Sequence, residues 1–261
     1  MLIIIVFTES GPEEPKTDTA KRTSVDKVVQ VKMRKIESDM EVISELTALK
    51  DKIVIDVGCG TGALVRDLTA RGARVTGIDI PEMLEKAQKV TPVGNEKYMA
   101  GKGESLPFEN NYADIILYIA SLHHVSPAKI NTAVEEVHRV LKPGGTIVFL
   151  EPVPRKGAYY EITRLVDDEK EILTLAYRAI KDAAPSRLKL KEESFVYFER
   201  SFENYVQILQ TFVSDEEKRN RALAEAKKVT QRLSRKAGVA FNDFRYKSIC
   251  RVNVLQKPVE A

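Results

Sequence analysis

The stretch that most constrains the fold is 52–62, with the sequence KIVIDVGCGTG. Its first half is a short run of β-branched residues, typical of a strand that is buried on both faces of a parallel sheet. Three glycines at alternate positions then allow a sharp turn and let a ligand approach the main chain. We expect Thr61 to cap a following helix, whose free N–H groups would face the same place. A strand, a glycine turn and a helix N-terminus in this order predict a nucleotide-type site at the carboxyl edge of a parallel sheet.

The charges around this turn separate two kinds of nucleotide. Gly58, Gly60 and Ala63 fit the GxGxxG/A pattern of dinucleotide sites, so NAD is one candidate. Asp56 stands two residues before the first glycine, where a carboxylate suits an ammonium group better than a pyrophosphate. S-Adenosylmethionine carries an ammonium and a sulfonium but no phosphate, so Asp56 favours it. Asp79 ends the next expected strand, and its oxygens can accept hydrogen bonds from the ribose hydroxyls that both ligands contain.

Five motifs follow one another between residues 56 and 152: DVGCGTG, GIDI, GESLPF, ADIILYIASLHHV and EVHRVLKPGGTIVFLEP. As a set, over about residues 50–152, they resemble the class I S-adenosylmethionine-dependent methyltransferases. They are most similar to the group that includes the ubiquinone/menaquinone-type and other small-molecule methyltransferases. The alternation of strands and helices predicts an α/β fold with a parallel sheet and right-handed crossovers. The resemblance implies a doubly wound, seven-stranded, mostly parallel sheet and a methyl-transfer activity.

The resemblance also implies where S-adenosylmethionine would bind. The methionine part would lie over Asp56 and along the glycine turn, the ribose at Asp79, and the adenine beside Gly103 and Glu104. Two positions depart from the family: Lys102 replaces a frequent acid, and the segment 79–84 is one residue shorter than usual. The expected cofactor-binding residues are Asp56, Gly58, Cys59, Gly60, Asp79, Ile80, Met83, Gly103, Glu104 and Ala120.

Two histidines are the candidates for a catalytic role. His123 and His124 follow the strand expected over 113–120, beside the place where the transferred methyl should lie. An imidazole with a near-neutral pKa is suited to take a proton from an O–H or N–H nucleophile. LHHV also occurs in this family without such a role, so plain packing stays open. We expect no metal, because the sequence shows no third ligand.

The rest of the chain extends this core at both ends. The apolar residues 1–7 suggest an edge strand or a tail packed on a partner, and the spacing of apolar residues over 25–49 predicts an amphipathic helix. Strands over 194–201 and 244–256 would form an antiparallel pair at one sheet edge, with helices inserted between them. The expected units are an N-terminal tail and linker (1–24), the cofactor-binding core (25–152), a helical, aromatic-rich substrate cap with a late strand (153–243), and the final strand and tail (244–261).

Composition narrows the partners. The net charge of +3 is too small to demand nucleic acid, although a lysine- and arginine-rich helix over 215–237 keeps an RNA methyltransferase open. A protein methyltransferase and a non-catalytic cofactor-binding scaffold also stay open. Nine of the eighteen phenylalanines and tyrosines fall in 152–212, which suggests a small, apolar or aromatic acceptor. Two cysteines and the lack of a membrane-spanning stretch lead us to expect a cytoplasmic protein.

Overall fold

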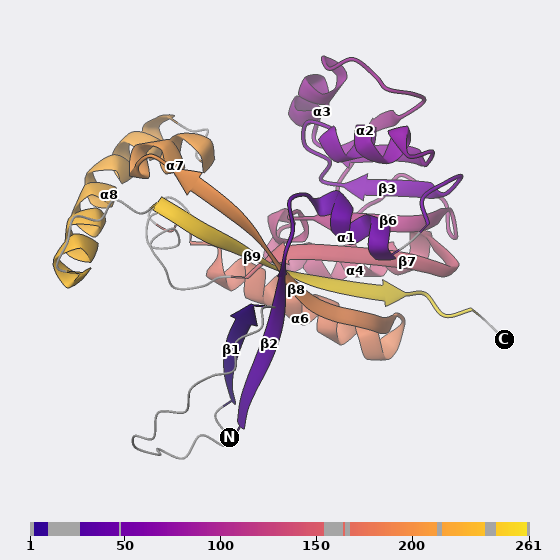
Figure 1. The fold of residues 1–261 in the computed structure, drawn as a ribbon. Helices are drawn as coiled ribbons and strands as arrows, with labels where there is room; N and C mark the ends of the chain where they lie inside the picture. Colours follow the sequence, from indigo (N-terminus) through magenta and orange to yellow (C-terminus); the bar gives the residue numbers. More distant parts are fainter. Residues whose placement is uncertain are drawn as a thin grey trace.

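The computed structural model describes residues 3–9, 27–46, 48–153, 164, 168–212, 216–237 and 244–259. These residues form one nine-stranded sheet in the order β1-β2-β8-β9-β7-β6-β3-β4-β5 (Figure 1). The strands are β1 (Ile3–Glu9), β2 (Lys27–Lys35), β3 (Ile53–Val57), β4 (Arg74–Asp79), β5 (Lys97–Ala100), β6 (Ala113–Ile119), β7 (Leu141–Pro152), β8 (Lys189–Phe202) and β9 (Phe244–Gln256).

Helices cover both faces of this sheet. They are α1 (Asp39–Leu46), α2 (Ala63–Ala70), α3 (Pro81–Gln88), η1 (Leu122–His124), η2 (Pro127–Lys129), α4 (Ile130–Val140), α6 (Lys170–Ser186), α7 (Tyr205–Phe212) and α8 (Glu216–Ala237). None of these helices is both long enough and apolar enough to cross a lipid bilayer.

The seven strands from β8 to β5 are the predicted core. β3 lies in the middle and pairs in parallel with β4 on one side and β6 on the other. The chain therefore winds outward from β3 in two directions, and the carboxyl end of β3 lies at the point where the winding reverses. Ligands of open α/β sheets bind at such a point. The predicted doubly wound α/β fold is confirmed.

The central strands are apolar throughout because their alternate side chains point into two different helical layers. In β3, Val54 belongs to the cluster under α1, α2 and α3, whereas Ile55 belongs to the cluster under α4 and α6. Both side chains are fully buried. Tyr118 and Phe149 face the α4 and α6 layer, with ring centroids 5.5 Å apart. A strand between two helical layers buries both its faces, so it loses the polar alternation of a surface strand.

The N-terminal region differs from the prediction. The helix expected over 25–49 is wrong: β2 occupies 27–35 and only the short α1 follows. The sequence KVVQVKMRK has valines and methionine in near alternation, and their side chains favour a strand once a neighbouring strand is present. β2 pairs in parallel with both β1 and β8. The first residues thus extend the sheet from seven to nine strands. Residues 10–26, most of the expected linker, lie outside the described part.

The C-terminal prediction is confirmed. β8 and β9 pair antiparallel from Lys189↔Gln256 to Phe202↔Phe244. Between them, α7 and α8 pack on each other through Ile208, Leu209 and Ala226. Figure 1 shows these helices at the outer ends of β8 and β9, away from α2 and α3. Part of the helix expected from 162 onward is present as α6 (Lys170–Ser186), whereas residues 154–163 and 165–167 lie outside the described part of the chain.

Candidate functional site

The glycine turn after β3 is held in place by both neighbouring strands. Gly58, Gly60 and Gly62 have φ of +78°, +56° and +73°. The N–H groups of Gly58 and Cys59 donate to the carbonyl of Ile78 on β4, at 2.8 and 3.1 Å. A Cβ at Gly58 would lie 2.4 Å from Ser121 Cβ, so the chain after β6 packs directly against the turn.

The other two glycines of the turn have different surroundings. A Cβ at Gly62 would lie 2.4 Å from Tyr98 Oη, whereas a Cβ at Gly60 would have one neighbour, Met83 Cε at 3.8 Å. The main chain at Gly60 is therefore open to a ligand. Gly62, not Thr61, is the N-cap of α2, and it makes no side-chain cap bond. The prediction for Thr61 is wrong, because the contact with Tyr98 and the left-handed backbone at Gly62 set where the helix begins.

Asp79 is bound to this turn by both carboxylate oxygens. Oδ2 accepts a hydrogen bond from the N–H of Gly60 and Oδ1 from the N–H of Ile80, each at 2.7 Å. A carboxylate has about four acceptor positions, so about two remain for the hydroxyls of a ribose. The carboxylate is thus oriented before any ligand arrives.

Asp56 lies at the end of β3 and is only 2% exposed. Burial raises the pKa of Asp56 to about 7, with the nearby charges of Asp39 and Asp79 contributing to the rise. Asp39 begins α1, and burial raises its pKa as well, while Arg200 opposes that shift. The sequence did not single out Asp39, because 25–49 was expected to be one helix. An acid at the start of a short helix is the signal that could have indicated it.

Three carboxylates therefore gather where β3 and β4 end. A ligand with an ammonium and a sulfonium would be attracted here and would favour ionised Asp56. A pyrophosphate would be repelled by the same acids. The acids fit S-adenosylmethionine and disfavour NAD.

The remaining predicted residues lie along the same edge of the sheet. Met83 on α3 is half-buried beside Gly60, and Ile80 is 48% exposed. The segment holding Gly103 and Glu104 starts next to Asp79, since the N–H of Gly101 donates to the Asp79 carbonyl at 3.1 Å.

Local contacts and backbone geometry explain the residue types at Gly103, Ala120 and Cys59. Tyr118 Oη donates to the carbonyl of Gly103 at 3.3 Å and fills the space that a Cβ there would need. Ala120 has a φ of +50°, which turns the chain as β6 ends. Burial raises the pKa of the Cys59 thiol to about 12, and its sulfur packs against Gly77. Cys59 is thus a protonated space-filling residue and no nucleophile.

The two histidines stand just beyond this edge, on η1. His123 is 5% exposed, and its Nδ1 lies 2.5 Å from Oε2 of Glu151. A carboxylate only accepts hydrogen bonds, so Nδ1 carries a proton, and when the ring is neutral its lone pair is on Nε2. Nε2 faces Oε1 of Glu169 at 3.8 Å. His124 is exposed, and its ring centroid lies 4.1 Å from that of His123.

Glu151 orients this part of the site. The sequence favours a solvated loop at Glu151 over a substrate contact, and the burial of its side chain shows that the solvated-loop interpretation is wrong. Glu151 is 7% exposed at the end of β7, and its Oε1 accepts hydrogen bonds from the N–H groups of Ser121 and Leu122 at 3.1 and 2.8 Å. An acid that closes an apolar strand, as in IVFLE, is the signal for a buried carboxylate.

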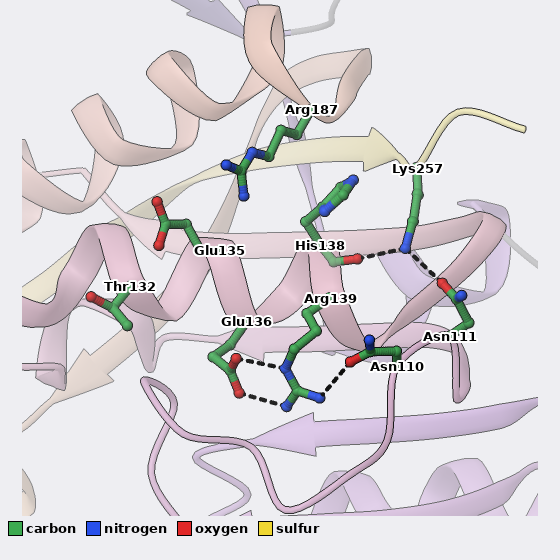
Figure 2. Close-up of a pocket in the computed structure, with 9 residues that line it drawn as sticks. All are labelled: Asn110, Asn111, Thr132, Glu135, Glu136, His138, Arg139, Arg187 and Lys257. Carbon is green, nitrogen blue, oxygen red and sulfur yellow. Dashed lines mark hydrogen bonds and ion pairs between the residues drawn. The ribbon is translucent and has the colours of Figure 1, made fainter. Parts of the chain in front are cut away.

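An open pocket of about 390 Å³ lies at the opposite edge of the sheet. Figure 2 shows its residues on α4, in the loop before β6, just after α6 and just after β9. Lys257 donates to Asn111 Oδ1 at 2.7 Å and to the carbonyls of His138 and Leu141 at 2.9 Å. These bonds join the end of α4 to the chain after β9, so the pocket is a structural feature distant from the glycine turn.

A doubly wound sheet with a glycine turn and acids at two adjacent strand ends defines a nucleoside-binding domain of the Rossmann-like type. Comparison with known proteins indicates to which family of such domains this one is similar. Residues 55–149 match the family model described as a methyltransferase domain. This match supports a class I S-adenosylmethionine-dependent methyltransferase.

Individual relatives agree with this family. The chain is 37% identical over 108 residues to an uncharacterised methyltransferase of Mycobacterium bovis, covering 41% of this chain and 42% of that one. It is 34% identical over 164 residues to the demethylmenaquinone methyltransferase of Tropheryma whipplei, covering 58% and 66%. A solved S-adenosylmethionine-dependent methyltransferase of Methanosarcina mazei shares the fold, with a TM-score of 0.55, 18% identity and coverage of 86% and 100%. The match spans less than half the length of the mycobacterial relative.

Proposed function

We propose that this protein transfers the methyl group of S-adenosylmethionine to a small-molecule acceptor. The observation that carries the proposal is the arrangement of Asp56 and Asp79 around the glycine turn, with Asp79 already oriented by the N–H groups of Gly60 and Ile80. The bound cofactor would supply a methyl group on a sulfonium, which is already activated for displacement.

The protein's own residues would position and orient the reactants. Asp79 would hold the ribose, Asp56 would attract the amino end of the cofactor, and Gly60 would let it approach the backbone. Orientation and exclusion of water can lower a barrier by roughly 7–11 kcal/mol when the geometry is good. Because the sulfonium loses its charge as the methyl leaves in line, no oxyanion-stabilising device is required.

Of the two histidine candidates, we propose that His123 is the one that lies beside the acceptor. Glu151 holds its ring with a 2.5 Å contact to Nδ1, and η1 places it directly after β6. The ring of His123 is buried, whereas His124 is exposed to solvent. A buried ring held by a carboxylate keeps one orientation toward an acceptor, which favours His123.

An apolar or aromatic acceptor is the finer part of the proposal. Its support is the similarity to a demethylmenaquinone methyltransferase and the aromatic content of the segment after β7. The described rings of that segment also serve packing: Tyr197 lies with Met33 and Ile249, and Phe202 and Tyr205 pack beside α7 and α8.

Two measurements test the proposal. Calorimetry should show S-adenosylhomocysteine binding and no competition from NADH. Methyl transfer from labelled cofactor is then screened against a demethylated quinol, bulk RNA, protein and a small-molecule extract. Label in the quinol or extract fraction is the expected result. Label in RNA or protein would redirect the proposal to those acceptors, and binding without transfer to any of them would indicate a scaffold.

A further inference from the structure

Beyond the cofactor turn, η1 and the start of α6 bring three side chains of metal-binding type together. The ligand atoms of His123, His124 and Glu169 all lie within 4.8 Å of one another. The two histidines come from η1, which follows β6, and Glu169 is the residue that caps the N-terminus of α6. Residues that are far apart in sequence thus meet because α6 packs against η1.

The orientation of His123 is the second, independent observation. Its Nδ1 donates to the buried Glu151, so the neutral ring has its lone pair on Nε2, the nitrogen that faces Glu169. Histidines that bind metals usually donate their other N–H to a carboxylate, because this fixes the ring and makes the ligating nitrogen more basic. Glu151 is itself held by the N–H groups of Ser121 and Leu122.

We propose that His123, His124 and Glu169 bind a divalent first-row transition metal, with Glu151 orienting His123. Two imidazoles and one carboxylate suit zinc, iron or cobalt, whereas magnesium and calcium prefer oxygen ligands throughout. Three protein ligands leave at least one coordination position open. The proposal replaces the sequence-based expectation of no metal, since the third ligand comes from a distant helix that no local pattern connects to LHHV.

The open position suggests what the metal would do. It lies at the carboxyl edge of the sheet, on the β6 and β7 side of the glycine turn. If the proposed methyl transfer holds, an acceptor with a hydroxyl or enol oxygen would bind there, and the cation would favour its deprotonated form. This second step rests on the proposed function, whereas metal binding itself does not.

The chain offers a matched set of variants. Glu169→Gln and His124→Gln each remove one ligand at a partly or fully exposed position, so neither should disturb folding. His138→Gln is the control, because His138 is the third and last histidine of the sequence and lies at the opposite edge of the sheet. Glu151→Gln tests the orienting contact.

Metal-free protein is titrated with Zn²⁺ against a chelating dye, and with Co²⁺ while the visible spectrum is recorded. One equivalent should bind, without the thiolate absorption that Cys59 or Cys250 would cause. Outer-shell partners are worth about 10- to 100-fold in affinity, so Glu151→Gln should weaken binding by that factor and each ligand variant by about 100-fold or more. His138→Gln should bind as the wild type does.

Equal affinity in wild type, Glu169→Gln and His124→Gln would overturn the proposal, as would an equal loss in His138→Gln. S-Adenosylhomocysteine binding is measured on the same samples. In the proposed function that ligand binds to the acids after β3 and β4. If the wild-type protein did not bind it, the proposed function would be contradicted and the metal result would still stand.

Discussion

Replacement of Gly58 by alanine should destabilise the fold in two separable ways. A left-handed conformation, here φ +78°, costs a non-glycine residue about 1–2 kcal/mol. The new Cβ would also lie 2.4 Å from Ser121 Cβ, and overpacking of this kind typically costs about 1–3 kcal/mol. The expected loss is therefore about 2–5 kcal/mol.

Two further variants isolate the overlap. Gly60→Ala has a similar φ of +56° but open space around its Cβ, so it should cost only the conformational part, about 1–2 kcal/mol. Ser121→Gly removes the clashing atom and also the hydrogen bond from its Oγ to the Val57 carbonyl at 2.6 Å, which is worth about 1 kcal/mol.

A double-mutant cycle gives the decisive number. The double variant Gly58→Ala, Ser121→Gly should lose less free energy of unfolding than the two single variants lose together, and the difference should be about 1–3 kcal/mol. Urea unfolding followed by circular dichroism supplies the four free energies of unfolding. The reasoning would be refuted if Gly58→Ala and Gly60→Ala were equally destabilised and the cycle showed no coupling.

Three other predictions concern the acids and the lysine. Asp79→Asn should weaken S-adenosylhomocysteine binding by about 100-fold or more in calorimetry, because the two proposed hydrogen bonds from the ribose hydroxyls to this carboxylate are each worth about 1.5–3 kcal/mol. The control is Asp67→Asn, which changes an exposed acid and should bind normally. The folded-state pKa of Asp56, about 7, lies above its ordinary 3.8, so the folded chain holds an extra proton between these values. Stability should fall as the pH rises from about 4 to about 7, and Asp56→Asn should flatten that fall in urea titrations; an unchanged slope would contradict the assignment. Lys257→Met leaves two carbonyls short of a donor and should cost about 2–4 kcal/mol of unfolding free energy, whereas the surface change Lys89→Met should cost nothing measurable.

Local patterns were sufficient for the central sheet and the cofactor turn. The apolar run before Gly58, the acid that ends β4 and the strand pair near the C-terminus each carry their information within a few residues. The structure brings Asp56, Asp79 and the glycines to one edge, as parallel pairing of β3 and β4 requires. Cofactor contacts stay a prediction at all ten positions: Asp56, Gly58, Cys59, Gly60, Asp79, Ile80, Met83, Gly103, Glu104 and Ala120.

Other features depend on partners far away in the chain. The spacing of apolar residues over 25–49 as a whole suits a helix, but 27–35 is a strand because β1 and β8 offer hydrogen bonds on both sides. Thr61 is a good N-cap by composition, yet Tyr98 fixes Gly62 in that place.

The surroundings of the two histidines show most clearly what the sequence determines and what the tertiary structure determines. The sequence by itself determined the seven-stranded core of the sheet, the glycine turn and the two acids, because strand periodicity and backbone freedom are local properties. Only the tertiary structure decided that Glu151 orients His123 and that Glu169 faces it. These acids come from β7 and from the start of α6, and their approach follows from packing, which no spacing along the chain encodes.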